Sequence, residues 1–248
     1  MTNHDCLRPV LQSEMPDGQR AVAAARLPAM RSVDLVDWLR VDDAYSAQLA
    51  LKADLIADQR GDVIAVCDGA GAALAELLDY TLAHLPDGFA VSGEAVTRPD
   101  GVSVALDRDD PLLTLSRIVQ EDLCILQKQG DEHVLTAALL CFPASWTLAQ
   151  KIGKPLLAIH VPVAEYDENI AKRVQRLFDG VQVGRPLWRA NYLGYDKAAL
   201  YQPRREGDPR PVGGAGAPFD RSERQTVLRL PNTGAVVFSI HSTVVAVG

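Results

Sequence analysis

The stretch QTVLRLPNTGAVVFSIHSTVVAV (residues 225–247) decides the fold, because two apolar runs flank a clear turn signal within it. The runs 225–230 and 235–247 are rich in valine and other residues that favour strands, and PNTG at 231–234 supplies turn residues. The pattern predicts a β-hairpin, and therefore antiparallel pairing in the sheet to which the hairpin belongs.

Upstream of this hairpin, apolar residues recur with the spacing of amphipathic helices. Helices are predicted at 33–56 (with a break at Asp42–Asp43 that could cap a second helix), 72–85, 112–128 and 168–178. The inward-facing residues of the third helix are expected to be Leu115, Ile118, Val119, Leu123 and Leu126. Strands are predicted at 134–142 and 155–163, a strand or helix end at 63–66, and a turn or hairpin around RPDG (98–101).

The order of these elements indicates the fold class. Helices come first and strands follow, which predicts an α+β fold with a largely antiparallel sheet. We expect residues 1–30 to form an N-terminal extension and residues 31–248 to form a single domain. The segment 203–220 is so rich in glycine, proline and charge that we predict a mobile loop there.

Charge and cysteine content limit the class of protein. With 25 basic and 32 acidic residues the net charge is −7, and the sequence lacks the basic stripe that binding to nucleic acid requires. The four cysteines form no CxxC pair, which favours free thiols in a reducing cytoplasm. No signal peptide is evident, and the longest apolar region is too interrupted to span a membrane. We therefore expect a soluble, cytoplasmic protein.

Common catalytic motifs are weak or missing in the sequence. The segment DGAGAALAEL (68–77) matches GxGxxA, but no further βαβ units follow it, and a loop entering a helix explains the glycines better. GxSxG, HExxH and Walker motifs are absent. The sequence therefore does not support hydrolase, zinc-protease or P-loop chemistry.

His160 is the histidine most enclosed by apolar residues, within the predicted strand PLLAIHVPV (155–163). A buried imidazole needs a partner for each ring nitrogen. His160 is therefore either a hydrogen-bonded core residue or a metal ligand, and the residues alone leave both interpretations open. His133 follows two acidic residues and is expected to be exposed.

Four segments carry a family resemblance when they are considered together: RIVQEDLCILQ (117–127), CFPASWTLAQKIGKPLLAIHVPV (141–163), RANYLGY (189–195) and RSERQTVLRLPNTGAVVFSI (221–240). The combination resembles the α-subunit family of haem-dependent oxidative N-demethylases. The similarity extends from about Leu27 to Val247 and includes VDWLRVDDAYSAQLALKADLI (36–56). This resemblance implies a PAS-like antiparallel sheet, flanked by helices, that binds haem b.

The resemblance also implies a reaction. Dioxygen activated at the haem iron oxidises an N-methyl group of a small secondary amine such as dimethylamine, giving formaldehyde and the demethylated amine. Electrons are expected from NAD(P)H through a separate flavin and iron–sulfur reductase, and a folate-binding subunit is a further expected partner. Two alternatives to this enzyme remain: a non-catalytic PAS-like haem or small-ligand sensor, and a cofactor-free structural subunit of a demethylase-like complex.

The same resemblance suggests residues for the cofactor. His160 is the expected axial ligand of the iron, with the sixth position left for dioxygen. Arg221 and Arg224 are expected to pair with the haem propionates, although an ion pair with Glu223 is an alternative. Trp146 is expected to pack against the porphyrin, although aromatic residues at such positions are more often plain core.

Three further residues are expected near the substrate. Glu165, Tyr166 and Asn191 lie in segments that could provide an acceptor for an alkylammonium group near the iron. Two positions depart from the family pattern, because Tyr192 replaces an expected tryptophan and His241 replaces an expected arginine. His241 is therefore expected either beside the pocket or on the outer face of the sheet.

Overall fold

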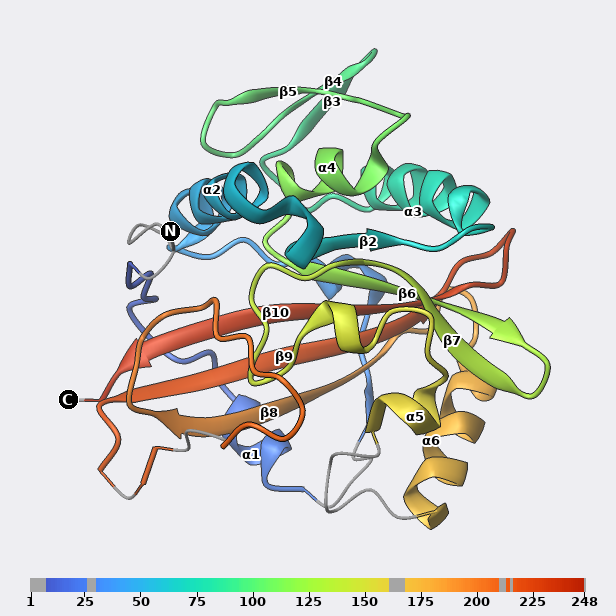
Figure 1. Cartoon of the computed structure of the whole chain (residues 1–248). Coiled ribbons are helices and arrows are strands. Elements are labelled where there is room, and N and C mark those ends of the chain that lie inside the picture. The colour runs from blue at the N-terminus through green and yellow to red at the C-terminus, as the bar shows by residue number, and fades with distance from the viewer. Residues whose placement is uncertain (1–7, 26–29, 161–167, 210–212, 215, 248) are drawn as a thin grey trace.

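A seven-stranded antiparallel sheet forms the centre of the molecule (Figure 1). The computed structural model describes residues 8–25, 30–160, 168–209, 213–214 and 216–247. The strands lie in the order β1 (Arg31–Ser32), β8 (Leu187–Tyr195), β9 (Phe219–Arg229), β10 (Val236–Ala246), β6 (Asp122–Gln129), β7 (Glu132–Leu139) and β2 (Ile64–Val66). A separate three-stranded sheet consists of β3 (Ala90–Ser92), β4 (Ala95–Thr97) and β5 (Ser103–Ala105).

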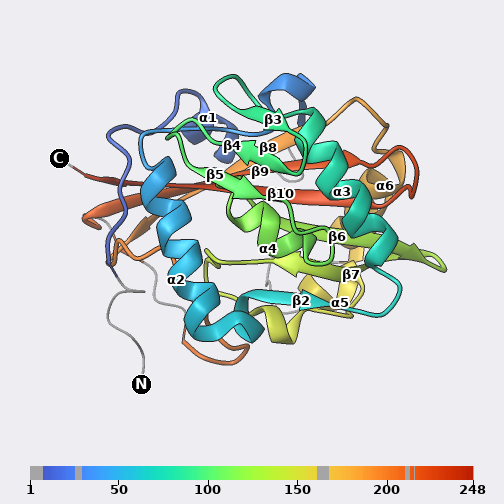
Figure 2. The same cartoon turned by 90° about the horizontal axis from the view of Figure 1, so that it is seen from above.

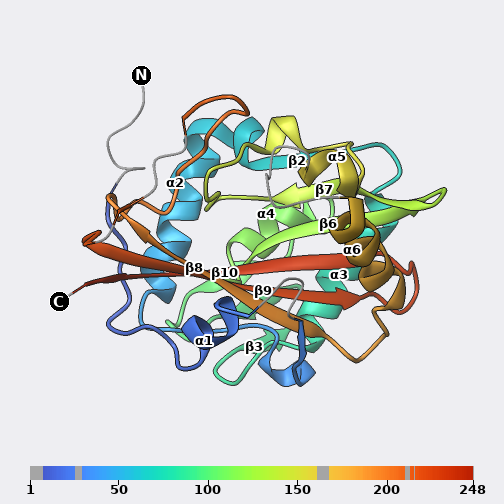
Figure 3. The same ribbon diagram turned by 90° about the horizontal axis from the view of Figure 1, so that it is seen from below.

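Helices cover both faces of the large sheet. The helices α2 (Tyr45–Val63), α3 (Gly71–Ala83) and α4 (Pro111–Ser116) lie across one face, which we call the α2 face (Figures 1 and 2). The short helix α5 (Leu156–His160) and the longer α6 (Glu168–Gly180) lie on the other, which we call the α6 face (Figure 3). The helix α1 (Gln19–Ala23) packs against β8. None of the described helices combines the length and apolar character needed to cross a membrane.

Each face of the sheet has its own apolar core, because side chains alternate along a strand. The core of the α2 face includes Leu51, Leu55, Leu77, Leu123 and Val237. The core of the α6 face includes Leu126, Leu135, Phe178, Val227 and Ile240. The central strands are therefore buried on both sides.

The predicted hairpin is confirmed. Strands β9 and β10 pair antiparallel from Val236–Arg229 to Ala246–Phe219. Gly234 has a φ of 69° in the connecting turn, a conformation that glycine adopts without strain. The strand β9 begins at Phe219, so the last two residues of the loop predicted at 203–220 belong to the sheet.

Other predictions of elements are also confirmed. The helices predicted at 72–85 and 168–178 correspond to α3 and α6, and the turn at 98–101 connects β4 to β5. Residues 63–66 contain both predicted alternatives, since α2 ends at Val63 and β2 begins at Ile64. The mixed α+β class and the antiparallel sheet flanked by helices are confirmed. The likeness to PAS domains stays a prediction.

The helix predicted over 112–128 is wrong. Only Pro111–Ser116 is helical, and residues from Asp122 onward form β6. Strand β6 lies between β10 and β7, so that Leu123 enters one core and Cys124 enters the other. A strand buried on both faces carries consecutive apolar residues, and over a short stretch these also match the spacing of a helix.

The strand predicted over 155–163 is also wrong where the structure describes it. Residues Leu156–His160 form α5, and the Ile159 amide donates to the Pro155 carbonyl at 3.0 Å. A proline is well tolerated where a helix starts, because its missing N–H would have no partner within the helix. Residues 161–163 lie outside the described residues.

Candidate functional site

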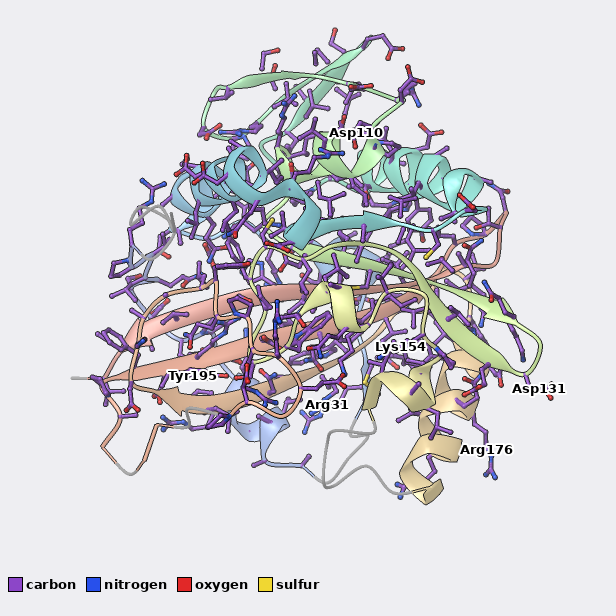
Figure 4. The ribbon with its side chains drawn as sticks, in the orientation of Figure 1. Arg31, Asp110, Asp131, Lys154, Arg176 and Tyr195 are labelled. Atoms are coloured by element: carbon purple, nitrogen blue, oxygen red, sulfur yellow. The ribbon has the colours of Figure 1, made fainter. Side chains whose placement is uncertain are left out.

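Five polar residues of β8 and β9 share the α6 face of the sheet. The register pairs Asn191 with Glu223 and Arg189 with Gln225, and Arg221 lies two residues before Glu223. We call these five residues the β8–β9 polar group. Tyr195, labelled in Figure 4, lies at the end of β8, and its ring centre is 5.7 Å from the Arg221 guanidinium carbon.

Glu223 is the centre of this group. Its side chain is almost completely buried, and Asn191 Nδ2 donates to Oε2 at 2.8 Å while Gln225 Nε2 donates to the same oxygen at 3.2 Å. Arg221 Nη2 donates to Oε1 at 3.3 Å. In return, Asn191 Oδ1 accepts from the Glu223 amide at 2.8 Å. The carboxylate is therefore held in one orientation by three side chains.

Arg221 connects the sheet to the segments that cover it. Its Nη1 donates to the Leu200 carbonyl at 2.9 Å, and its Nη2 donates to the Phe142 carbonyl at 2.7 Å. The predicted alternative, an ion pair between Arg221 and Glu223, is therefore present, although β9 is an inner strand and not an edge. The Arg221 guanidinium therefore joins β9 to the segments around Phe142 and Leu200.

Arg189 differs from Arg221 because its guanidinium has no hydrogen bond or ion pair with any residue that the structure describes. Its Nε atom is buried and unpartnered. Burial lowers the pKa of Arg189, and the nearby charge of Glu223 offsets only part of this effect. Arg189 is therefore a half-buried cation with a negative charge nearby but not in contact.

An apolar wall adjoins Arg189 on the same face. Leu187 precedes Arg189 by two residues on β8 and packs against the α6-side core together with Phe238. Trp146 and Ile159 contribute to the same wall from the covering segment and from α5. An apolar surface that ends at an unpaired cation suits a flat, amphipathic ligand with a carboxylate.

The predicted metal ligand His160 is the last residue of α5. The backbone just before it is fixed, because Lys151 Nζ donates to the Ile159 carbonyl at 2.5 Å and pairs with Glu206 Oε1 at 2.7 Å. The predicted site residues Glu165 and Tyr166 lie outside the described residues. Asn191 belongs to the β8–β9 polar group, and Trp146 lies in the adjoining wall.

His133 is buried, with 1% of its surface exposed, so the prediction that it is exposed is wrong. Its Nδ1 atom lies 2.9 Å from Gln175 Nε2, and the ring centre lies 5.6 Å from that of Phe178, both on α6. Its Nε2 atom has no hydrogen-bond partner among the described residues. Burial lowers the pKa of His133, which favours the neutral imidazole. Its acidic neighbours in the sequence gave no sign that α6 covers the ring.

The sequence matches the family model for haem-dependent oxidative N-demethylase, alpha subunit-like, over residues 29–247. The chain belongs to this family. Membership suggests a role in haem-dependent oxidative N-demethylation, and the family description implies dependence on haem and a demethylase of more than one subunit.

The residues of the α6 face fit the haem that this demethylase family requires. A porphyrin packs against an apolar wall, its propionates pair with cations, and its iron is commonly bound by a neutral imidazole. The wall around Leu187 and the unpaired guanidinium of Arg189 meet the first two needs. For the iron, the structure shows that the backbone of His160 ends α5, and that His133 on the α6 face has a buried Nε2 without a partner among the described residues.

Arg224 does not share this face with Arg221. Its Nη1 and Nη2 atoms donate to the carbonyls of Trp38 and Asp37 at 3.0 and 2.8 Å, on the α2 face. Burial lowers the pKa of Arg224 to about 10. Because strand residues alternate, the two arginines of the RSER segment point to opposite sides of the sheet. The position of Arg224 does not favour a role in the same site as Arg189.

His241, which departs from the demethylase pattern, is also on the α2 face. Its Nε2 lies 3.0 Å from Asp42 Oδ2 and its Nδ1 lies 3.1 Å from Glu121 Oε1. Burial alone would lower the pKa of His241, but the hydrogen bonds and charges of Asp42 and Glu121 outweigh it and raise the pKa to about 9. His241 is therefore a buried imidazolium in a structural network, neither at the α6-face site nor exposed.

A cavity of about 290 Å³ lies beside the α6-side core, between the segments 143–149 and 201–208. Leu140 and Leu148 of that core form part of its wall, and Asp62 and Asp208 contribute carboxylates. The cavity is large enough for a small amine, and no motif in the sequence indicated it.

Proposed function

We propose that this chain is the haem-binding catalytic subunit of an enzyme that removes an N-methyl group from a small secondary amine such as dimethylamine. The observation that carries the proposal is the unpaired Arg189 guanidinium beside an apolar wall on the α6 face. Bound haem would supply the iron chemistry that couples dioxygen to oxidation of the methyl group. Family membership supports the same conclusion.

The residues of this chain would then have distinct roles. His160 would bind the iron through a neutral ring nitrogen, and Leu187 and Trp146 would exclude water from the porphyrin. Glu223, with Asn191 as its hydrogen-bond partner, would attract the alkylammonium group, because it is the fixed carboxylate of the β8–β9 polar group. Glu165 and Tyr166 remain predicted acceptors.

The balance of the reaction requires partners outside this chain. The N–CH3 group, dioxygen, two electrons and two protons give N–H, formaldehyde and water. We propose that the electrons come from NAD(P)H through a separate flavin and iron–sulfur reductase, that a folate-binding subunit receives the formaldehyde, and that the assembly works in the cytoplasm. The alpha-subunit description of the family supports a complex of this kind.

An absorption spectrum and oxygen uptake test this function. The chain, expressed or reconstituted with haem, is expected to show a Soret band and to consume oxygen with a reductant and dimethylamine. Absence of the Soret band would contradict the proposal and favour a cofactor-free structural subunit. Haem binding without oxygen uptake above the amine-free control would instead favour a sensor.

Two matched histidine variants identify the ligand. His160→Ala is expected to abolish haem retention while the urea midpoint of the apo chain stays unchanged. His133→Ala is the matched control, and it is expected to retain haem. If His133→Ala loses the Soret band and His160→Ala keeps it, the ligand assignment is wrong although the haem function stands.

A further inference from the structure

The arginines of β8 and β9 differ in how their guanidinium groups are satisfied. Arg221 donates through its Nη atoms to two backbone carbonyls and to Glu223, although its Nε is buried and unpartnered, and Arg224 donates to two carbonyls. Arg229 donates to the carbonyls of Val181, Gly234 and Phe178 at 2.6–2.7 Å. Arg189, on the neighbouring strand, makes none of these contacts with the described part of the chain.

A half-buried cation without a partner is unfavourable in a folded protein. Removing a charged group from water costs several kcal/mol unless hydrogen bonds or an opposite charge replace the lost hydration. Most buried N–H groups in native structures therefore have an acceptor. The buried Nε of Arg189 indicates that an acceptor outside the described residues completes the site.

Glu223 is not that acceptor, even though it lies nearby. Its two oxygens accept from Asn191, Gln225 and Arg221, and neither oxygen forms a hydrogen bond or an ion pair with Arg189. The charge of Glu223 acts on Arg189 without a contact between them. The free guanidinium fork has the geometry for a bidentate pair with a carboxylate.

The surroundings of Arg189 define the ligand more closely. Leu187 lies on one side of it along β8, and the polar pair Asn191–Glu223 lies on the other. A ligand whose carboxylate contacts Arg189 would therefore have an apolar body toward Leu187, or an ammonium group toward Glu223. Haem has a carboxylate and an apolar body, whereas an N-methylated amino acid has a carboxylate and an ammonium group.

We propose that Arg189 binds a ligand carboxylate on the α6 face. The carboxylate belongs either to a haem propionate or to an N-methylated amino acid substrate, and the choice between them rests on the proposed function. The binding role of Arg189 does not rest on the proposed function, because the evidence for this role is the unpaired guanidinium.

Titrations of the whole chain test this role, with Arg189→Met as the variant and Arg31→Met as the matched control. Arg31 is an exposed arginine on β1, the strand next to β8, so its replacement removes the same charge without touching the α6 face. Haem, haem with both propionates esterified, N-methylglycine and dimethylamine are the ligands. Binding is followed by the Soret band for the porphyrins and by calorimetry for the amines.

Loss of one charge-assisted pair corresponds to about tenfold weaker binding. If Arg189 binds a propionate, Arg189→Met weakens haem about tenfold and leaves the esterified haem unchanged. If it binds a substrate carboxylate, the variant weakens N-methylglycine about tenfold and leaves dimethylamine unchanged. Arg189→Lys keeps the charge but loses the fork, and is expected to recover only part of the affinity.

Stability separates this role from a structural one. Since Arg189 has no partner in the described structure, Arg189→Met is expected to leave the urea midpoint unchanged or raise it, whereas loss of a structural arginine would lower it. The proposal is overturned if Arg189→Met binds haem and N-methylglycine as the wild type does, or if the wild type binds neither. A wild type that binds N-methylglycine through Arg189 but takes up no haem would refute the proposed function alone.

Discussion

The two faces of the sheet bury charged side chains in different ways. On the α2 face, Lys52 Nζ lies 3.1 Å from Asp122 Oδ1 and donates to the Glu121 carbonyl at 2.7 Å, and both side chains of the pair are at most 1% exposed. His241 lies between Asp42 and Glu121 in the same network. Every one of these charges has an opposite charge within hydrogen-bonding distance.

On the α6 face, three buried side-chain nitrogens have no hydrogen-bond partner among the described residues. Nε2 of His133 and the Nε atoms of Arg189 and Arg221 are nitrogens without acceptors in the described residues. On the α2 face, the unpartnered side-chain atoms of the described residues are oxygens: the hydroxyls Thr81 Oγ1 and Thr243 Oγ1, and the carboxylate atoms Glu121 Oε2 and Asp122 Oδ1. The carboxylates of the α2 face lie beside Lys52 and His241. Arg221 on the α6 face is paired with Glu223, whereas Arg189 on that face has no counter-charge in contact among the described residues.

The sharpest test of this contrast removes Lys52. Lys52→Met keeps the apolar stem but leaves Asp122 buried without its counter-charge, so the free energy of unfolding is expected to fall by about 3–5 kcal/mol. Urea unfolding followed by circular dichroism measures the change.

Lys128→Met is the control, because Lys128 and Asp179 form a pair with 48% and 38% of their side chains exposed. It should change the free energy by no more than about 0.5 kcal/mol, and similar losses in both variants would contradict the contrast.

The His241 network is expected to make stability depend on pH. Because the folded-state pKa of His241 is about 9 against an ordinary 6.5, its stabilisation is fully present below pH 6.5 and is lost as pH rises through 9. Burial alone would raise the pKa of Asp42, but hydrogen bonds and the charge of His241 lower it to about 2. The Asp42 contribution is therefore lost as pH falls through 2, and both shifts describe the same ion pair.

This dependence can be measured with His241→Gln. The gap in unfolding free energy between wild type and variant is expected to narrow by about 3 kcal/mol between pH 6.5 and a pH above 9. Asp42→Asn tests the cause, since without Asp42 the pKa of His241 falls and the loss of stability should begin at lower pH. A gap that stays constant with pH would show that His241 is not charged in the folded protein.

Local patterns predicted the fold where an element has one apolar face or is bounded by a clear turn, and failed where neither signal is present. The hairpin at 225–247, α3 and α6 follow from periodicity and turn residues. Strand β6 looked helical because both of its faces are buried, which makes its apolar residues consecutive. Strand β8 gave no strand signal, because Trp188 and Tyr192 face one side while Arg189 and Asn191 face the other, and neither side is uniformly apolar.

The candidate site depends on long-range contacts that the sequence does not reveal. Asn191 was predicted, but its partner Glu223 is on another strand, 32 residues away. Arg189 stands out only because the other arginines of these strands have partners, which is a property of the assembled sheet. The mobility predicted for 203–220 stays a prediction.

The smallest expected effect concerns the link between α5 and the segment 203–209. Lys151 Nζ joins the Ile159 carbonyl to Glu206, and Gln150 Oε1 accepts from the Glu206 amide at 2.9 Å. Lys151→Met removes the link, but the Glu206 side chain is 33% exposed and can turn to water, so overall stability should fall far less than in Lys52→Met. The expected result is about tenfold faster hydrogen exchange at the α5 amides, with β10 unchanged.

Lys154→Met is the matched control for this link, because Lys154 lies in the same segment and its charge acts on Glu206 without a side-chain hydrogen bond or ion pair to the described residues. Its exchange pattern is expected to equal that of the wild type. If Lys151→Met accelerates exchange in β10 as much as in α5, the lysine supports the whole sheet and the α6 face is as tightly integrated as the α2 face. If α5 exchange does not change, the helix that carries His160 is held by its apolar contacts with the α6-side core alone.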